Sequence, residues 1–167
     1  MFARTPDLRE WVFAQHVIFV GGGNTKSMLG VWREWALDEV LRDAWEKGII
    51  LSGVSAGAIC WFEQGSTDSY ANRLTVLDCL GFLPGSCCPH YDIEEERRPA
   101  LQRMMRERNI SSGIALDNDS AAHFVGTDLH QVVSARPDAQ GYKICVLDGA
   151  VQEVPLKTVY LTVSECT

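Results

Sequence analysis

A serine stands between two glycines in Gly53-Val54-Ser55-Ala56-Gly57, which has the G-x-S-x-G spacing of a nucleophile elbow. The apolar residues 49–54 predict a buried strand that ends here, and the residues 55–61 predict a helix. A tight turn between strand and helix projects the serine hydroxyl, and the Ala56 amide at the helix N-terminus favours developing negative charge. Ser55 is therefore a candidate nucleophile, with a serine that only caps a helix as the alternative.

A nucleophilic serine needs a base, and the chain offers four histidines, namely His16, His90, His123 and His130. His16 begins an apolar strand pattern, and His123 lies in an alternating one. His90 lies in a polar, glycine-containing segment, residues 63–91, which has the composition of loops. We therefore expect His90 to be the base, ahead of His130.

Three glycines follow the apolar run 16–20, in Gly21-Gly22-Gly23-Asn24-Thr25. A Walker lysine is missing, and Lys26 stands where a G-x-G-x-x-G motif has its last glycine. Nucleotide binding is therefore not indicated. Exposed amides of Gly22 and Gly23 at the end of a strand would instead serve as oxyanion donors opposite Ala56. A plain tight turn is the alternative.

Taken in this order, residues 18–25, 53–58 and 88–91 resemble the peptidase E family of aspartyl dipeptidases, which has cyanophycinase as a relative. The resemblance extends from residue 7 to about residue 156. It implies a flavodoxin-like α/β fold, similar to class I glutamine amidotransferases, with a mostly parallel sheet flanked by helices. It also implies a serine hydrolase that removes N-terminal aspartate from dipeptides and needs no cofactor or metal.

The resemblance assigns roles to individual residues. Ser55 would be the nucleophile and His90 the base, while Gly22, Gly23 and Ala56 would surround the oxyanion. These roles agree with those expected from the residue types and spacing alone.

The resemblance also implies that further residues bind the substrate or take part in catalysis. Asn24 and either Arg97 or Arg98 would bind substrate, the guanidinium by pairing with its aspartyl carboxylate. Asp68, in the segment after the elbow, matches an acidic residue important for activity in the family. A solvated aspartate and salt bridges from the arginines to residues 94–96 are the alternatives.

The chain departs from the family where a carboxylate would orient the histidine, since Asn118 matches that position. An asparagine can hold an imidazole by a hydrogen bond, but it cannot stabilise an imidazolium by charge. Asp68, Asp117 and Asp119 are the alternatives for the third member of the triad. A catalytically weak or silent protein that binds an acidic ligand or a protein partner is accordingly the competing function.

The family has about one more β-α-β unit before the glycine-rich strand, so the domain is expected to be N-terminally shortened. In a 2-1-3-4-5 strand order, this leaves residues 17–20 as an unpaired edge. We therefore expect a homo-oligomer, in the simplest case a dimer.

The remaining pattern predicts the elements that hold these residues. Helices are expected at 7–15, with Thr5 as cap and Pro6 in the first turn, at 26–47 with a break near Ala36, and at 94–108. Short strands are expected at 114–116, 121–125, 131–134 and 142–147. One domain would occupy residues 1–167.

Composition limits the function classes. The 167 residues carry a formal net charge of −7, which would repel nucleic acid. Residues 1–10 lack a signal-peptide layout, and no apolar run approaches the ~20 residues of a membrane span, so we expect a soluble cytoplasmic protein without membrane partners. The six cysteines are expected to be reduced, and Cys88 beside His90 is a weak nucleophile candidate.

Overall fold

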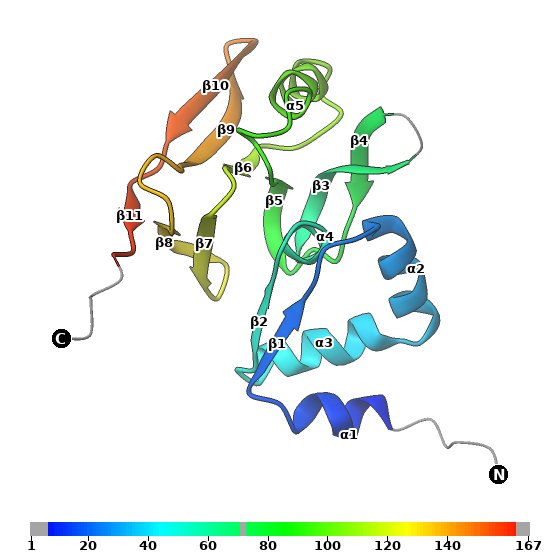
Figure 1. Ribbon diagram of the computed structural model, residues 1–167. Helices are drawn as coiled ribbons and strands as arrows, with labels where there is room; N and C mark the ends of the chain where they lie inside the picture. Colours follow the sequence, from blue (N-terminus) through cyan, green and yellow to red (C-terminus); the bar gives the residue numbers. More distant parts are fainter. Residues whose placement is uncertain (1–6, 71–72, 163–167) are drawn as a thin grey trace.

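The computed structural model describes residues 7–70 and 73–162 (Figure 1). Its N-terminal part runs through α1 (Leu8–Phe13), β1 (Val17–Val20), α2 (Thr25–Glu34), α3 (Leu37–Glu46) and β2 (Ile50–Gly53). The strands β1 and β2 pair in parallel, with Val17 opposite Ile50. The two helices α2 and α3 form the crossover between these strands, and α1 packs on α3. This is a β-α-β arrangement, which requires parallel strands.

The central sheet has six strands in the order β10-β9-β6-β5-β3-β4. The strands β3, β5 and β6 are mutually parallel, whereas β4, β9 and β10 pair antiparallel to their neighbours. The bounds are β3 (Phe62–Tyr70), β4 (Arg73–Asp78), β5 (Leu83–Cys88), β6 (Gly113–Leu116), β9 (Gly141–Leu147) and β10 (Ala150–Pro155). A smaller sheet has the order β11-β8-β7, formed by β7 (Ser120–Val125), β8 (Asp128–Ser134) and β11 (Thr158–Tyr160).

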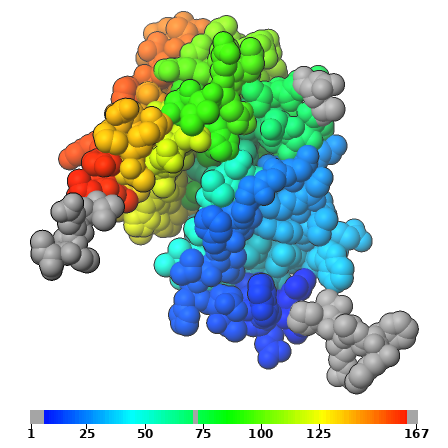
Figure 2. Space-filling view, viewed as in Figure 1, coloured from blue at the N-terminus to red at the C-terminus, as the bar shows by residue number. Residues whose placement is uncertain are grey.

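Side chains on the two faces of the central sheet enter two separate cores. Cys87 and Ile114 pack into the core that includes α2, α3 and α4 (Ala56–Ile59), whereas Cys88 and Ala115 pack into the core under α5 (Arg97–Arg106). This alternation follows from the pleat of a strand, which sends successive side chains to opposite faces. Figure 2 shows the N-terminal segments in blue and the C-terminal strands in orange on different sides of the green central segments. The α/β, flavodoxin-like fold class is thereby confirmed.

The break between α2 and α3 is confirmed at Ala36, which adopts a left-handed conformation with φ 51°. Asn24 caps α2 by accepting a hydrogen bond from the Ser27 amide at 2.9 Å. At α1, Asp7 is the cap and accepts from the amides of Arg9 and Glu10. The expected cap Thr5 and the expected first-turn Pro6 lie outside the described residues.

The prediction of loops for residues 63–91 is wrong for most of the described residues, because β3, β4 and β5 lie between residues 62 and 88, whereas His90 does lie outside the strands. Its small polar residues have the composition of loops, yet several are buried by close packing. Gly65 in β3 lies against Ile59 of α4, where a Cβ atom would come within 1.8 Å of the isoleucine side chain. Small residues here allow the helix to approach the sheet, so composition alone misleads.

Other boundaries also differ from those expected. The helix predicted at 94–108 is the shorter α5, and the strands β10 and β11 were not predicted. The strand β10 is an antiparallel strand at the end of the sheet, and polar Glu153 shares its part-buried face with Val151, which weakens the apolar pattern. The strands predicted between residues 114 and 147 are confirmed as β6, β7, β8 and β9.

The strands β1 and β2 are only partly buried, in contrast to the buried strand predicted for residues 49–54. Phe19 is 67% exposed, and Val17 and Ile50 are exposed beside it. Among the described strands, β1 pairs with β2 alone, so its other edge is free. The homo-oligomer remains a prediction. No helix in the described ranges is long and apolar enough to cross a membrane.

Three backbone segments meet at Val20, Gly53 and Gly57. A Cβ atom on Gly57 would lie 2.1 Å from the Val20 carbonyl oxygen, and one on Gly53 would lie 2.3 Å from the Gly57 carbonyl oxygen. Both contacts are with backbone, which cannot move aside as a flexible side chain can. The glycines of the elbow are therefore required by packing.

We predict that Gly57→Ala lowers the free energy of unfolding by roughly 3 kcal/mol, because the methyl group overpacks β1. Urea unfolding followed by circular dichroism measures this change. The matched control is Gly30→Ala in α2, where a Cβ atom meets nothing within 4 Å. That control should raise stability by up to about 1 kcal/mol. Equal effects of the two substitutions would contradict the packing argument.

Candidate active site

Ser55 occupies the turn between β2 and α4 in a strained backbone conformation, with φ 55° and ψ −115°. This region is sparsely populated for residues other than glycine, and such strain is common at functional sites. Two backbone hydrogen bonds maintain the turn: Val54 donates to the Val20 carbonyl at 3.0 Å, and Gly57 donates to the Val54 carbonyl at 2.9 Å. The serine hydroxyl consequently projects from the end of the strand.

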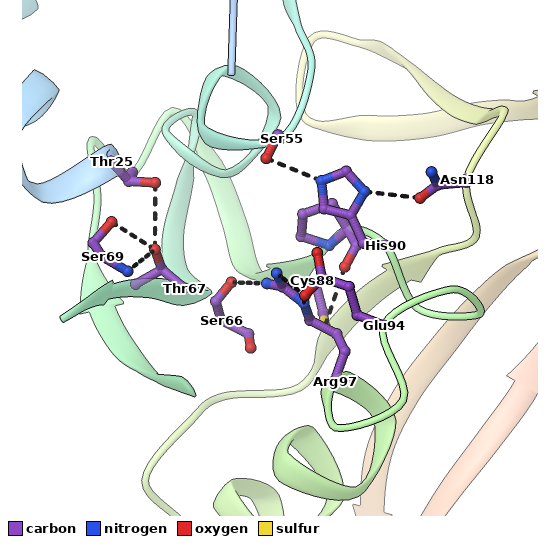
Figure 3. Close-up of polar contacts among 11 residues, drawn as sticks. Thr25, Ser55, Ser66, Thr67, Ser69, Cys88, His90, Glu94, Arg97 and Asn118 are labelled. Atoms are coloured by element: carbon purple, nitrogen blue, oxygen red, sulfur yellow. Dashed lines mark hydrogen bonds and ion pairs between the residues drawn. The ribbon is translucent and has the colours of Figure 1, made fainter. Parts of the chain in front are cut away.

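His90 follows the end of β5 and also has a positive φ, 58°. Its Nε2 atom lies 3.0 Å from the Ser55 hydroxyl oxygen (Figure 3). The next residue, Tyr91, donates its amide to the Leu116 carbonyl at 3.1 Å and so ties the segment to the end of β6. The imidazole therefore faces the serine from the end of β5, a strand of the central sheet.

Asn118, just after β6, completes a hydrogen-bonded chain. Its Oδ1 atom lies 2.8 Å from His90 Nδ1, on the side of the ring away from Ser55 (Figure 3). A carbonyl oxygen can only accept, so Nδ1 carries the proton and Nε2 is left to accept from the Ser55 hydroxyl. A general base acting on the serine needs this tautomer.

The two aspartates beside Asn118 face other partners. Asp117 accepts the Gln140 amide at 2.9 Å, and burial raises the pKa of its carboxyl group. Asp119 is 58% exposed and lies 3.4 Å from the Arg136 guanidinium. Of the residues that the sequence left open for this role, Asp68 included, Asn118 is the one whose side chain is hydrogen-bonded to the histidine.

The glycine-rich turn lies beside the serine. A Cβ atom on Gly22 would be 3.3 Å from the Ser55 Cβ atom. Ala56 is the first residue of α4, and the first amides of a helix have no partner within it. The amides of Gly22, Gly23 and Ala56 thus belong to two turns that meet at the hydroxyl.

Asn24 uses its carboxamide within the protein. Besides capping α2, it donates through Nδ2 to the Ser69 carbonyl at 3.0 Å and so connects the glycine-rich turn to β3. Asp68 lies in β3 and not in a loop, and its side chain is exposed. Its neighbour Thr67 faces inward, where its hydroxyl contacts Ser69 at 2.8 Å.

The two arginines have different surroundings. Arg97 is buried; its Nε donates to Glu94 Oε2 at 2.8 Å, and its Nη1 donates to the Ser66 carbonyl at 3.2 Å (Figure 3). Arg98 is part-exposed and pairs with Glu153 of β10. The expected alternative of an ion pair with residues 94–96 is therefore present at Arg97, although the guanidinium itself is buried.

The sequence interpretation missed Asp92 and Arg136. The Asp92 carboxylate accepts the Asn118 amide at 2.8 Å and is paired with Arg136. The proximity of Asp92 to His90 in the sequence was a signal that could have suggested its involvement. Arg136 lies in the segment after β8, and nothing in its local sequence points to Asn118.

Cys88 is unsuited to act as a nucleophile beside His90. The residue is 1% exposed, and burial raises the pKa of its thiol to about 12. Among the described residues, no three His, Cys, Asp or Glu side chains are grouped as a metal site requires.

A strained serine at a strand-to-helix turn, hydrogen-bonded to a histidine that follows the end of β5, defines the architecture of nucleophile-elbow α/β proteins. Comparison with known proteins agrees with this class of site. The pattern of peptidase family S51 matches residues 3–132. An uncharacterized peptidase of Bacillus subtilis (strain 168), YgaJ, is 48% identical over 155 residues, which are 93% of this chain and 67% of that protein. The chain belongs to peptidase family S51, which confirms the resemblance found in the sequence.

We predict that Cys88 and Cys87 resist alkylation by iodoacetamide at neutral pH in the folded protein, because burial raises the pKa of both thiols and the thiolate is the reactive form. Peptide mass spectrometry after timed labelling measures the rates. Cys145, which is part-exposed, is the internal control and should react faster. Rapid modification of Cys88 would restore it as a nucleophile candidate.

Proposed function

We propose that this member of family S51 is a serine dipeptidase that removes N-terminal aspartate from dipeptides. The observation that carries the proposal is the chain of hydrogen bonds from Ser55 through His90 to Asn118. It has the order and the distances that nucleophilic acyl transfer requires. Membership of a peptidase family supports hydrolysis of a peptide bond as the reaction.

In the first half of the proposed reaction, the Ser55 hydroxyl oxygen attacks the scissile carbonyl carbon while His90 Nε2 takes the hydroxyl proton. The carbonyl oxygen becomes an oxyanion, which the amides of Gly22, Gly23 and Ala56 stabilise. The intermediate then collapses: the C–N bond breaks, and His90 gives its proton to the leaving amine. The aspartyl group is left as an ester on Ser55.

In the second half, His90 takes a proton from a water molecule, whose oxygen attacks the ester carbonyl. The bond to the Ser55 oxygen breaks, and the proton returns from His90 to the serine. One water molecule is consumed, and aspartate and the second amino acid are the products. The strained Ser55 backbone keeps the hydroxyl in the same position throughout.

Arg97 supports the proposed preference for aspartate. Its guanidinium is buried, and its partner Glu94 has a side chain that is 43% exposed. We propose that the aspartyl carboxylate of the substrate displaces the Glu94 carboxylate from Arg97. The exchange leaves the buried positive charge paired, which avoids the large cost of an uncompensated charge. Arg98 is held by Glu153 and serves packing in this scheme.

We predict that the protein releases aspartate from Asp-Leu faster than it cleaves Ala-Leu or a β-aspartyl dipeptide. Ser55→Ala should lower the rate at least about 1000-fold, because the nucleophile is removed. Chromatographic measurement of free aspartate tests this. Asp68→Asn and Arg97→Lys, assayed alongside, test the expected roles of those residues.

A folded protein that cleaves none of the three substrates would contradict the proposal. It would favour the catalytically silent alternative, which has its own support in the uncharged Asn118.

Asn118→Asp should raise kcat for Asp-Leu by roughly tenfold or more, because a carboxylate stabilises the His90 imidazolium by charge as well as by a hydrogen bond. Steady-state kinetics at neutral pH measure the change. Asn109→Asp, the same substitution at an exposed position after α5, is the matched control and should leave kcat unchanged. A decrease in kcat in Asn118→Asp alone would show that the amide is required as it is.

A further inference from the structure

The backbone of Asn118 is held at both of its polar groups. Its amide donates to Asp92 Oδ1 at 2.8 Å, and its carbonyl accepts from the Arg136 Nη2 at 3.3 Å. The other oxygen of Asp92 pairs with the same guanidinium. Asp92, Arg136 and the Asn118 peptide groups thus form a closed ring of interactions, which we call the Asn118 clamp. Neither charged side chain has a hydrogen bond or ion pair with Ser55 or His90, whose partners are each other and Asn118.

The segment that carries Asn118 needs such a restraint. It is an irregular turn between β6 and β7, in which Asp119 has a positive φ of 64°. Within the turn, Ser120 donates its amide to the Asp117 carbonyl at 3.2 Å, but this bond bypasses Asn118. The clamp supplies the contacts that fix the asparagine itself.

The neutral side chain of Asn118 makes its position more important. A carboxylate attracts an imidazolium over several ångströms, whereas an amide stabilises it only through a hydrogen bond of good geometry. A displacement that a charged residue would tolerate therefore breaks the contact of Asn118 Oδ1 with His90 Nδ1. The histidine would then lose both its orientation and its tautomer.

We propose that Asp92 and Arg136 are positioning residues that hold Asn118 against His90 and thereby keep the base in the tautomer that accepts from Ser55. The inference rests on the proposed serine mechanism, which it deepens. It assigns the two charged residues to catalysis through Asn118 and not to substrate binding.

The electrostatics of the ring favour a persistent interaction. Partial burial tends to raise the pKa of Asp92, but the hydrogen bonds from Asn118 and Arg136 outweigh it and lower the pKa. Arg136 also faces Asp119 at 3.4 Å and Asp138 at 4.0 Å, so negative charge surrounds the guanidinium. The ion pair is partly exposed, and such pairs contribute about 1 kcal/mol or less to stability. Variants that lack it should therefore fold.

The test is a double-mutant cycle with Asp92→Ala and Asn118→Ala. The rate at which a fluorophosphonate probe modifies Ser55 reports how well His90 activates the serine and does not depend on the peptide substrate. We expect Asp92→Ala to lower this rate roughly 100-fold, as misplacement of a catalytic group does. When Asn118 is already replaced by alanine, Asp92→Ala should lower the probe rate only slightly further, because Asp92 acts through Asn118.

A second readout separates positioning from general stability. The ¹⁵N chemical shifts of His90, assigned by their loss in His90→Gln, distinguish the Nδ1–H tautomer from the other. We expect the Nδ1–H tautomer in the wild-type protein and a mixture in Asp92→Ala. Asp92→Asn keeps one acceptor for the Asn118 amide but loses the ion pair, so it should give an intermediate result.

The matched control is Asp43→Ala, which removes the exposed ion pair with Arg9 between α1 and α3. It should change neither the probe rate nor the tautomer. The inference would be overturned if Asp92→Ala left the His90 tautomer unchanged. It would also be overturned if the rate in the double variant fell by the product of the two single losses. If the wild-type protein fails to react with the probe or with Asp-Leu, the proposed function fails, while the His90 tautomer still decides the role of the clamp.

Discussion

The close approach of Val20, Gly53 and Gly57 is the constraint on which the rest of the site depends. Three backbone segments come together where no Cβ atom fits, and this contact forces the chain to turn sharply at Ser55. The strained conformation of the serine is therefore maintained by the packing of its neighbours together with the backbone hydrogen bonds of the turn. A site built in this way is rigid before any substrate arrives, which is what acyl transfer needs.

Four chain segments supply the site, and each follows the carboxyl end of a strand. Ser55 follows β2, the glycine-rich turn follows β1, His90 follows β5, and Asn118 follows β6. Because β1 and β2 are parallel to each other, as are β5 and β6, the side chains of each pair emerge at the same edge. This is the usual location of sites in open α/β sheets, since the turns there are free to vary while the strands stay in register.

The uncharged third residue changes how the histidine must be held. A carboxylate would combine orientation and charge in one group, whereas Asn118 supplies only the hydrogen bond. In this protein the charged groups are Asp92 and Arg136, which do not bind the histidine. They form hydrogen bonds with the backbone amide and carbonyl of Asn118 instead. The residue that orients His90 is therefore not the residue that carries negative charge. As a consequence, the positively charged imidazolium of His90 is stabilised less than it would be by a carboxylate.

The sequence by itself determined the elements with strong local signals: the elbow around Ser55, the histidine after it, the two helices with a break at Ala36, and the family. Each depends on residues close together in the chain, where spacing and glycine sterics leave little choice. Only the tertiary structure decided that Asn118, and not Asp117 or Asp119, contacts His90, and that Arg97 and Arg98 have carboxylate partners. It also decided that most of the described residues from 63 to 88 form strands. These outcomes depend on strand register and on contacts between distant segments, such as Arg136 with Asp92, which no local pattern records.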